Sequence, residues 1–180
     1  MRITGGILKG RRFSPPSNFR ARPTTDMAKE NLFNILTNFI DYEEINMLDL
    51  FAGTGSISFE FASRGCTDII SVENDYQHYK FICKCVEELE LQEIIKPVKQ
   101  DVFLFIQKVE KQQQFDMIFA DPPFEMRNIS KLPQLILDSN ILKKEGYLIV
   151  EHSPVYDFSK MDKFWQVRKY GKVWFSFFQE

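Results

Sequence analysis

The chain has 180 residues, 44% of them hydrophobic, which suits a single globular domain spanning residues 1–180 with one continuous core. No stretch approaches the roughly 18 uninterrupted apolar residues of a membrane helix, and the N-terminus lacks the apolar segment of a signal peptide. The three cysteines (Cys66, Cys83 and Cys85) are odd in number and lack metal-ligand spacing. We therefore expect reduced thiols, no metal site, no membrane association and a cytoplasmic location.

The charge is distributed unevenly. The formal net charge of −2 argues against a uniformly basic nucleic-acid-binding protein. Residues 1–25, however, contain six basic residues and no acidic one, and those six are Arg2, Lys9, Arg11, Arg12, Arg20 and Arg22. A basic arm on an acidic body suggests a polyanionic partner, although an ordinary solvated terminus is the alternative. Its glycines favour two short strands, so we interpret residues 1–22 as a basic β-hairpin extension.

The first helix is expected just after this arm. Pro23 restricts Arg22 to an extended conformation, and Thr24 or Thr25 can cap the helix that follows. Apolar residues then recur near helical spacing. They are Met27, Leu32, Phe33, Ile35, Leu36 and Phe39.

From residue 46 onward, short apolar runs alternate with amphipathic stretches. The expected strands are residues 47–51, 68–72, 94–98, 115–120 and 146–151. The expected helices are residues 55–63, 76–89, 103–109 and 130–137. This alternation indicates βαβ units and a mostly parallel sheet. Residues 164–170 and 173–178, around Gly171, predict a terminal hairpin with one strand antiparallel to the rest, which completes a seven-stranded α/β sheet.

The first motif is Asp49-Leu50-Phe51-Ala52-Gly53-Thr54-Gly55, between an expected strand and helix. Its glycines let backbone approach a ligand near a positive helix end. Dinucleotide-binding enzymes share Gly-x-Gly, but their third glycine would fall at Ser58. Asp49 can orient a charged ligand group, or it can simply cap its own turn.

Two further acids follow the next strands. The Glu73 carboxylate matches the vicinal hydroxyls of a ribose, while the nearby Asp75 can cap the next helix. Asp101 can accept from an adenine amino group, with Val102 and Phe103 flanking the ring. A helix N-cap explains Asp101 equally well.

The motif Asp121-Pro122-Pro123-Phe124 follows the fourth strand. Two prolines remove two backbone donors and stiffen the turn, which leaves the Asp121 carboxylate and the Pro122 carbonyl as acceptors. Phe124 adds a stacking surface. Two acceptors beside an aromatic ring suit an exocyclic NH2, because they hold both hydrogens and direct the nitrogen lone pair at an electrophilic methyl group. A rigid turn without chemistry is the alternative.

Together these motifs resemble the Rossmann-like class I amino-methyltransferases, and more narrowly the bacterial 16S ribosomal RNA guanine-N2 methyltransferase family, often called RsmD. The narrower resemblance spans essentially the full length. Its specific part is the N-terminal pair of motifs, Arg2-Ile-x-Gly-Gly-x-x-x-Gly-Arg and Arg22-Pro23-Thr24-Thr25-Asp26, and the match also includes Glu30-Asn31-Leu32-Phe33-Asn34. It continues through Asp49 to Gly55, Ser63-Arg64-Gly65, Asp121 to Phe124, and Val150-Glu151.

The resemblance implies methylation of a guanine in small-subunit rRNA, with S-adenosylmethionine as donor and an N-terminal hairpin gripping the RNA. It implies that Asp121, Pro122, Pro123 and Phe124 engage the base. It implies a cofactor site of Asp49, Phe51, Ala52, Gly53, Gly55, Glu73, Asp101 and Val102. The chain departs from the family at Met27-Ala28-Lys29, where arginines are usual. Lys29 keeps the charge but not the forked donor geometry, which puts details of RNA contact in question.

Other classes fit less well. Protein-glutamine methyltransferases usually carry Asn at the position of Asp121. DNA adenine or cytosine amino-methyltransferases share the site but usually add a target-recognition region, for which 180 residues leave little room. An NAD-linked oxidoreductase needs a third glycine and a base for hydride chemistry. The only histidines are His78, expected within a helix, and His152, expected to be a structural neighbour of Glu151. A non-catalytic RNA-binding module stays open. We expect a monomer, with the aromatics of the tail mostly in the core.

Overall fold

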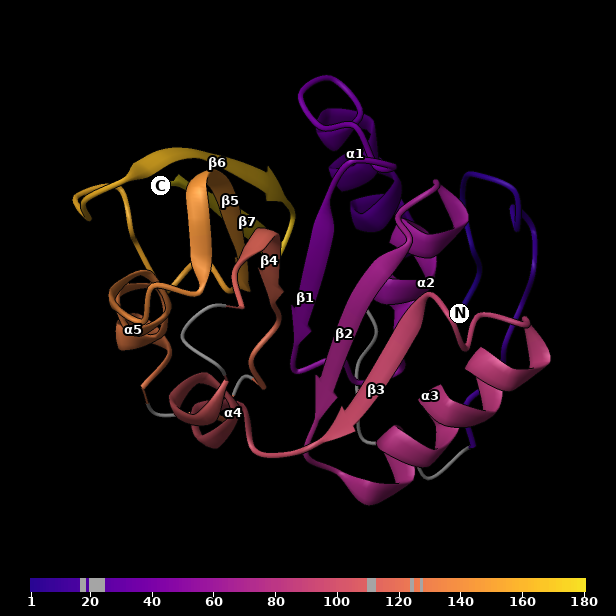
Figure 1. Ribbon diagram of the computed structural model, residues 1–180. Helices are drawn as coiled ribbons and strands as arrows, with labels where there is room; N and C mark the ends of the chain where they lie inside the picture. Colours follow the sequence, from indigo (N-terminus) through magenta and orange to yellow (C-terminus); the bar gives the residue numbers. More distant parts are fainter. Residues whose placement is uncertain (17–18, 20–24, 110–112, 124, 127) are drawn as a thin grey trace.

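The computed structural model describes residues 1–16, 19, 25–109, 113–123, 125–126 and 128–180. Its centre is a seven-stranded sheet with the order β3-β2-β1-β4-β5-β7-β6 (Figure 1). The strands are β1 Asn46–Leu50, β2 Asp68–Glu73, β3 Ile95–Lys99, β4 Phe115–Ala120, β5 Leu142–His152, β6 Phe164–Tyr170 and β7 Val173–Gln179. Only β7 runs against the others, since it pairs antiparallel with both β5 and β6. The predicted α/β sheet of seven strands with a terminal antiparallel hairpin is confirmed.

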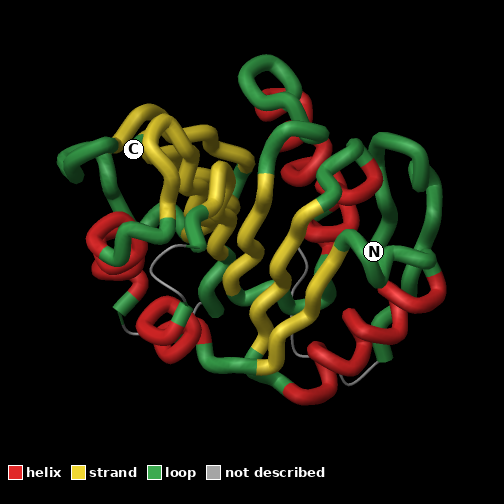
Figure 2. Tube along the Cα trace, in the orientation of Figure 1, coloured by secondary structure: helices red, strands yellow, loops and turns green. Residues whose placement is uncertain are grey.

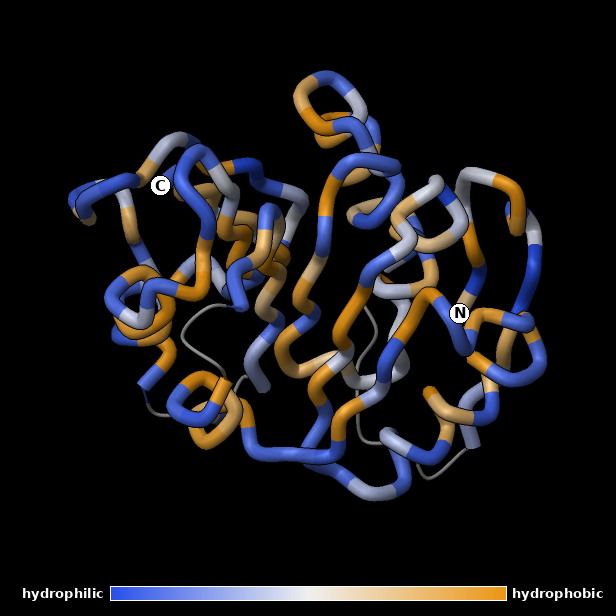
Figure 3. The backbone as a smooth tube through the Cα atoms, viewed as in Figure 1, coloured by the Kyte–Doolittle hydropathy of each residue, from blue (hydrophilic) through white to orange (hydrophobic). Residues whose placement is uncertain are grey.

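Helices cover both faces of this sheet (Figure 2). They are α1 Asp26–Leu36, α2 Ser56–Ser63, α3 Tyr76–Glu88, α4 Val102–Lys108, the 3-10 turn η1 Ile129–Lys131, and α5 Leu132–Asp138. Successive strand residues point to opposite faces, so Met47 packs with the helices α1 to α3 and Leu48 with α4 and α5. Figure 3 colours the backbone by hydropathy and shows hydrophobic stretches along the central strands. No described helix is both long and apolar enough to cross a membrane.

Helix α1 is shorter than its apolar periodicity predicts. Thr25 caps it, accepting from the Ala28 N–H at 3.2 Å, as one of the two predicted capping residues. The other, Thr24, lies outside the described residues. The helix ends at Leu36, and the residues up to Phe39 form a turn closed by N–H groups bonded to the Ile35 and Leu36 carbonyls.

Strand β5 is longer than predicted. It begins at Leu142, and its pairing with β4 shifts register between Phe115 and Met117. Glu145 takes a left-handed φ of 65° there. Gly146 follows, where a Cβ would lie 2.8 Å from the Lys143 carbonyl oxygen. Because this irregularity interrupts the apolar pattern, the sequence predicted only the part of the strand from Gly146 onward.

The N-terminal hairpin, residues 1–13, has less strand structure than expected. Its two arms run antiparallel but share a single β-bridge, between Arg2 and Arg12. The reason is that several of its amides bond to α2 instead of to the other arm. The N–H groups of Thr4 and Gly5 donate to the Glu60 carboxylate, and that of Ile7 donates to the Ser63 carbonyl. The arms are also joined by backbone bonds, from the Ile3 N–H to the Arg11 carbonyl and from the Phe13 N–H to the Met1 carbonyl, both at 3.0 Å. The predicted hairpin is therefore present, but its arms do not form strands, because the bonds to α2 interrupt the pairing.

Candidate active site

The parallel strands β1, β2, β4 and β5 all end at one edge of the sheet. Register pairs Leu50 with both Val72 and Ala120, and Ala120 with Val150. Ligands of open α/β sheets bind at the carboxyl ends of the strands. The ends of these four strands carry the carboxylates of Asp49, Glu73, Asp121 and Glu151.

The loop after β1 turns sharply through left-handed conformations. Phe51 has φ of 63°, followed by Gly53 at 56° and Gly55 at 73°. Such a conformation is ordinary for glycine but strained for phenylalanine, and strain of this kind concentrates at functional sites. A Cβ at Gly55 would also lie 2.8 Å from the ring of Phe59. The glycines thus allow a tight loop between β1 and α2.

Glu73 joins this loop to the end of β2. Its Oε2 accepts the Gly53 N–H and its Oε1 accepts the Asp75 N–H, both at 2.7 Å. Each carboxylate oxygen keeps a second lone pair. Asp75 caps α3 through the N–H groups of Gln77 and His78, as the alternative interpretation of that residue expected. The Nδ1 atom of His78 lies 4.0 Å from Glu73 Oε1. The sequence placed His78 in a helix but did not indicate that it would lie beside Glu73.

Asp49 is buried beneath the loop. Its Oδ2 accepts both the hydroxyl and the backbone N–H of Ser58, at 2.6 and 3.2 Å. The Ser58 hydroxyl also lies 2.5 Å from that of Ser71. Burial, helped by the charge of Glu73 and opposed by the Ser58 bonds, raises the pKa of Asp49 to about 7. Asp49 therefore accepts an N–H of the first turn of α2, as the capping alternative expected, and connects β1 to that helix.

Asp101 follows β3 at the same edge of the sheet. It is the N-cap of α4 and accepts from the Leu104 N–H at 3.1 Å. One of its two interpretations, the N-cap, is thus realised. Val102, the first residue of α4, is buried in the core cluster on this face of the sheet.

Asp121 leaves β4 beside the glycine loop, and its N–H donates to the Leu50 carbonyl at 3.3 Å. Burial raises the pKa of Asp121 well above its usual value, and the nearby charges of Glu151 and Asp49 add to this. Pro122 is buried and Pro123 is exposed, while Phe124 lies outside the described residues. A carboxylate whose pKa is raised can accept a hydrogen bond and binds a proton more readily than an ordinary aspartate.

Glu151, at the end of β5, was quoted as part of a motif but was not predicted as a site residue. It is buried, and its charge acts on Asp121. The available signal was an acid at the end of a strongly apolar run. His152, the next residue, is buried, and its ring bonds to the Ser176 hydroxyl and the Ser153 carbonyl at 2.7 and 2.9 Å.

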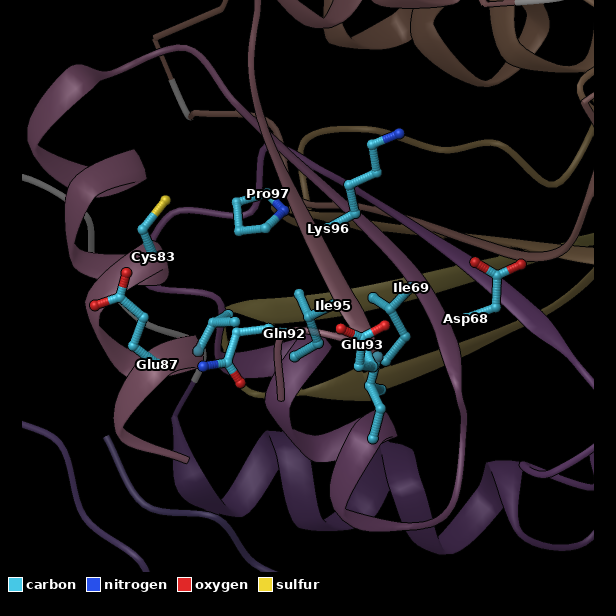
Figure 4. A pocket seen from close by; sticks show the side chains of 11 residues that line it. Asp68, Ile69, Cys83, Glu87, Gln92, Glu93, Ile95, Lys96 and Pro97 are labelled. Atoms are coloured by element: carbon cyan, nitrogen blue, oxygen red, sulfur yellow. The ribbon is translucent and has the colours of Figure 1, made fainter. Parts of the chain in front are cut away.

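A cleft of about 430 Å³ lies elsewhere, between α3 and the amino-terminal starts of β2 and β3 (Figure 4). Asp68, Ile95 and Glu87 are among its lining residues. Because the candidate site is at the carboxyl ends of the strands, this cleft is at the opposite edge of the sheet and is separate from it.

Comparison with known proteins agrees with this architecture. A family model described as "Conserved hypothetical protein 95" matches residues 1–179. The chain is 32% identical over 152 residues to the ribosomal RNA small subunit methyltransferase D of Haemophilus influenzae, covering 84% of this chain and 78% of that protein. The chain belongs to the RsmD family of methyltransferases.

Two further proteins are similar. A putative rRNA methyltransferase of Bacillus subtilis, YlbH, is 31% identical over 153 residues, which cover 84% of this chain and 82% of that one. The solved structure of a putative methyltransferase, yhhF, from Escherichia coli superposes with a TM-score of 0.84 at 26% identity, covering 100% and 97% of the two chains. The RsmD-like fold thus extends over the N-terminal hairpin as well as the sheet.

Lys29, where the resemblance led us to expect an arginine, is part of the protein interior. Lys29 is fully buried, and its Nζ lies 3.3 Å from Glu60 Oε2. It also donates to the Arg2 carbonyl at 2.6 Å and to the Ser56 hydroxyl at 3.0 Å. The ammonium group of Lys29 is thus enclosed under the hairpin and joins the hairpin to α1 and α2, while the effect of this residue on RNA contact stays a prediction. Burial lowers its pKa, although Glu60 opposes the shift.

The predicted RNA-binding residues are not equivalent in the structure. Lys9, Arg11 and Arg12 are exposed on the hairpin. Arg2 is half-buried and forms ion pairs with two acids of α1, Asp26 at 3.4 Å and Glu30 at 2.7 Å. Arg20 and Arg22 lie outside the described residues.

Proposed function

We propose that the chain transfers the methyl group of S-adenosylmethionine to the exocyclic N2 of a guanine in 16S ribosomal RNA. The observation that carries this proposal is the position of Asp121. Its carboxylate and the Pro122 carbonyl follow β4 directly beside the loop that Gly53 and Glu73 form. An acceptor pair for an amino group next to a nucleoside-binding loop fits amino methylation.

The residues at this edge fit the cofactor. Each oxygen of Glu73 holds one backbone N–H at 2.7 Å and keeps a lone pair, so the carboxylate can receive two vicinal ribose hydroxyls. Asp49 would hold the methionine ammonium group, and Asp101 with Val102 would hold the adenine. Phe51, Ala52 and Gly55 would shape the loop around it. S-adenosylmethionine, when bound there, supplies an electrophilic methyl group.

The base is held from the β4 side. Asp121 and the Pro122 carbonyl each accept one hydrogen of the amino group, which directs the nitrogen lone pair toward the methyl group. As the N–C bond forms and the S–C bond breaks, the nitrogen becomes acidic and loses a proton. Asp121 accepts that proton, and its raised pKa suits this role. We assign to Phe124 stacking on the base, and to Pro123 stiffening of the turn.

The hairpin supplies contact with RNA phosphates. We propose that Lys9, Arg11 and Arg12 neutralise phosphates, together with Arg20 and Arg22, and that Arg2 serves the hairpin's own ion pairs first. Binding should then weaken as salt rises. The target guanine must leave its stack or already lie exposed to reach Asp121.

The test is methyl transfer from labelled S-adenosylmethionine to three substrates in parallel: small-subunit particles lacking the modification, free 16S rRNA and duplex DNA. The proposal expects N2-methylguanosine in one of the RNA samples. Label in DNA alone would assign the chain to the DNA amino-methyltransferases. No label anywhere, despite cofactor binding, would favour a non-catalytic RNA-binding module.

A further inference from the structure

A second cleft, of about 410 Å³, lies between the N-terminal hairpin and the helices α1 and α2. Cationic side chains from three segments line it: Arg2 on the first arm of the hairpin, Lys9 in its turn and Arg64 at the end of α2. The Asn34 amide of α1 is a further donor in the lining. The cleft therefore gathers donors that suit an anionic ligand.

The one carboxylate in the lining is already engaged. Glu30 accepts from Arg2 Nη2 at 2.7 Å. Arg64 gives one nitrogen, Nη2, to the buried Glu60 at 3.1 Å. Lys9 is exposed and has no ion pair within the described part of the chain. Lys9 is thus the cation of this cleft that is left for an external partner.

Arg64 also keeps unused donors. Among the described residues, the buried side-chain nitrogen and oxygen atoms without a hydrogen-bond partner are the Nε of Arg2 and the Nε of Arg64. Each guanidinium has five N–H donors, and a buried donor without a partner is rare in a native structure. The Nε of Arg2 lies 3.4 Å from Asp26 Oδ2, within the ion pair described above, so the buried donor left without an acceptor is the Nε of Arg64. Arg64 thus brings to this cleft more donors than its bond to Glu60 uses.

Packing, more than hydrogen bonding, holds Arg64 in place. Its guanidinium lies over the Phe33 ring, 4.8 Å from the centroid. It also lies against Gly5, where a Cβ would come within 2.4 Å of Nη2. The Phe33 ring and the Gly5 backbone therefore hold Arg64 in position, even though not all of its N–H donors have an acceptor.

We propose that this cleft is a subsite for one phosphodiester group of the RNA, bound by Lys9 and Arg64 with Arg2 at its side. The inference rests on the proposed function, since it names a contact of the same RNA substrate. A phosphodiester carries one negative charge and several acceptor oxygens, which match one available ammonium group and unused guanidinium donors. Helix α2 separates the cleft from the glycine loop by about 12 Å, at 1.5 Å per residue. The phosphate therefore belongs to RNA flanking the target nucleotide.

The experiment is an interference assay with rRNA whose phosphates are randomly ethylated, so that single negative charges are removed. RNA that still binds in the presence of S-adenosylhomocysteine is separated and mapped. Wild type should exclude RNA ethylated at one particular phosphate, and this exclusion should disappear with Lys9→Gln and with Arg64→Lys. Arg64→Lys keeps the charge beside Glu60 but removes the forked donors. The control Lys108→Gln removes an exposed cation of α4 on the other face of the sheet.

A salt titration of the same variants gives a second readout. Lys9→Gln should reduce the slope of log affinity against log salt by roughly 0.7 to 0.9, as for one phosphate, whereas Lys108→Gln should leave it unchanged. If Lys9→Gln and Arg64→Lys retain the wild-type interference pattern and slope, the subsite is wrong. Methyl transfer by the wild type, measured on the same RNA, tells that failure from failure of the proposed function.

Discussion

The backbone N–H of Gly53 donates a 2.7 Å hydrogen bond to Oε2 of Glu73, which ties the loop after β1 to the carboxylate at the end of β2. Glu73→Gln would replace one acceptor oxygen by an NH2 group facing a backbone N–H. Since hydrogen bonds to a charged group contribute about 1.5 to 3 kcal/mol, we expect affinity for S-adenosylhomocysteine to fall roughly tenfold to hundredfold. Calorimetric titration measures it. The control Glu87→Gln, on the exposed side of α3, should bind normally, and normal binding by Glu73→Gln would contradict the cofactor assignment.

Asp49 predicts a dependence of stability on pH. Its pKa is about 7 in the folded protein and about 3.9 in an unfolded chain. Between these values the folded state holds the proton more tightly, so this residue's contribution to stability is lost as pH rises from about 4 to about 7. The Asp49→Asn side chain does not titrate. The unfolding free energy of this variant relative to wild type should therefore be about 3 kcal/mol larger at pH 8 than at pH 5. Urea unfolding at the two pH values measures this, and an equal difference at both would contradict the assigned pKa.

Glu151 predicts a shift of the pH–rate profile. Its negative charge adds to burial in raising the pKa of Asp121. If deprotonated Asp121 accepts from the base, activity increases with pH through this pKa. Glu151→Gln should then move the acid limb of kcat/KM to lower pH, by roughly one unit. Glu93→Gln, in the exposed loop before β3, is the control. A limb that stays in place, or moves to higher pH, would contradict the coupling of the two carboxyl groups.

Gly6 and Gly10 test how the hairpin is attached. Both have a left-handed φ, 72° and 89°, but a Cβ at Gly6 would lie 1.7 Å from the Ser63 carbonyl oxygen, whereas nothing lies within 4 Å at Gly10. Gly10→Ala should cost about 1 to 2 kcal/mol from backbone conformation alone. Gly6→Ala should cost more and should expose residues 1–13 to proteases. Equal unfolding free energies and equal cleavage of the two variants would show that the contact with α2 does not hold the hairpin.

Much of the fold could be predicted because its signals are local. Apolar runs and glycines placed β1 to β4 within one or two residues, and the same strand ends put Asp49, Glu73 and Asp121 at one edge of the sheet. Pairing between distant segments could not be predicted. Nothing near Lys29 in the sequence indicates that Glu60, 31 residues later, would meet its ammonium group inside the protein. The same limit applies to Arg2, whose ion pairs with α1 depend on how the hairpin lies on the helix.

The most direct test of the account is single-turnover methyl transfer by Asp121→Ala, with affinity for S-adenosylhomocysteine measured on the same preparation. We expect the rate on undermethylated rRNA or particles to fall about 100-fold to 1000-fold, as when a preorganised polar contact to the transition state is lost. Cofactor affinity should stay within about threefold of wild type, because Glu73 and the glycine loop are unchanged. Full activity with an alanine at position 121 would contradict the assignment of the methyl-transfer site to the end of β4.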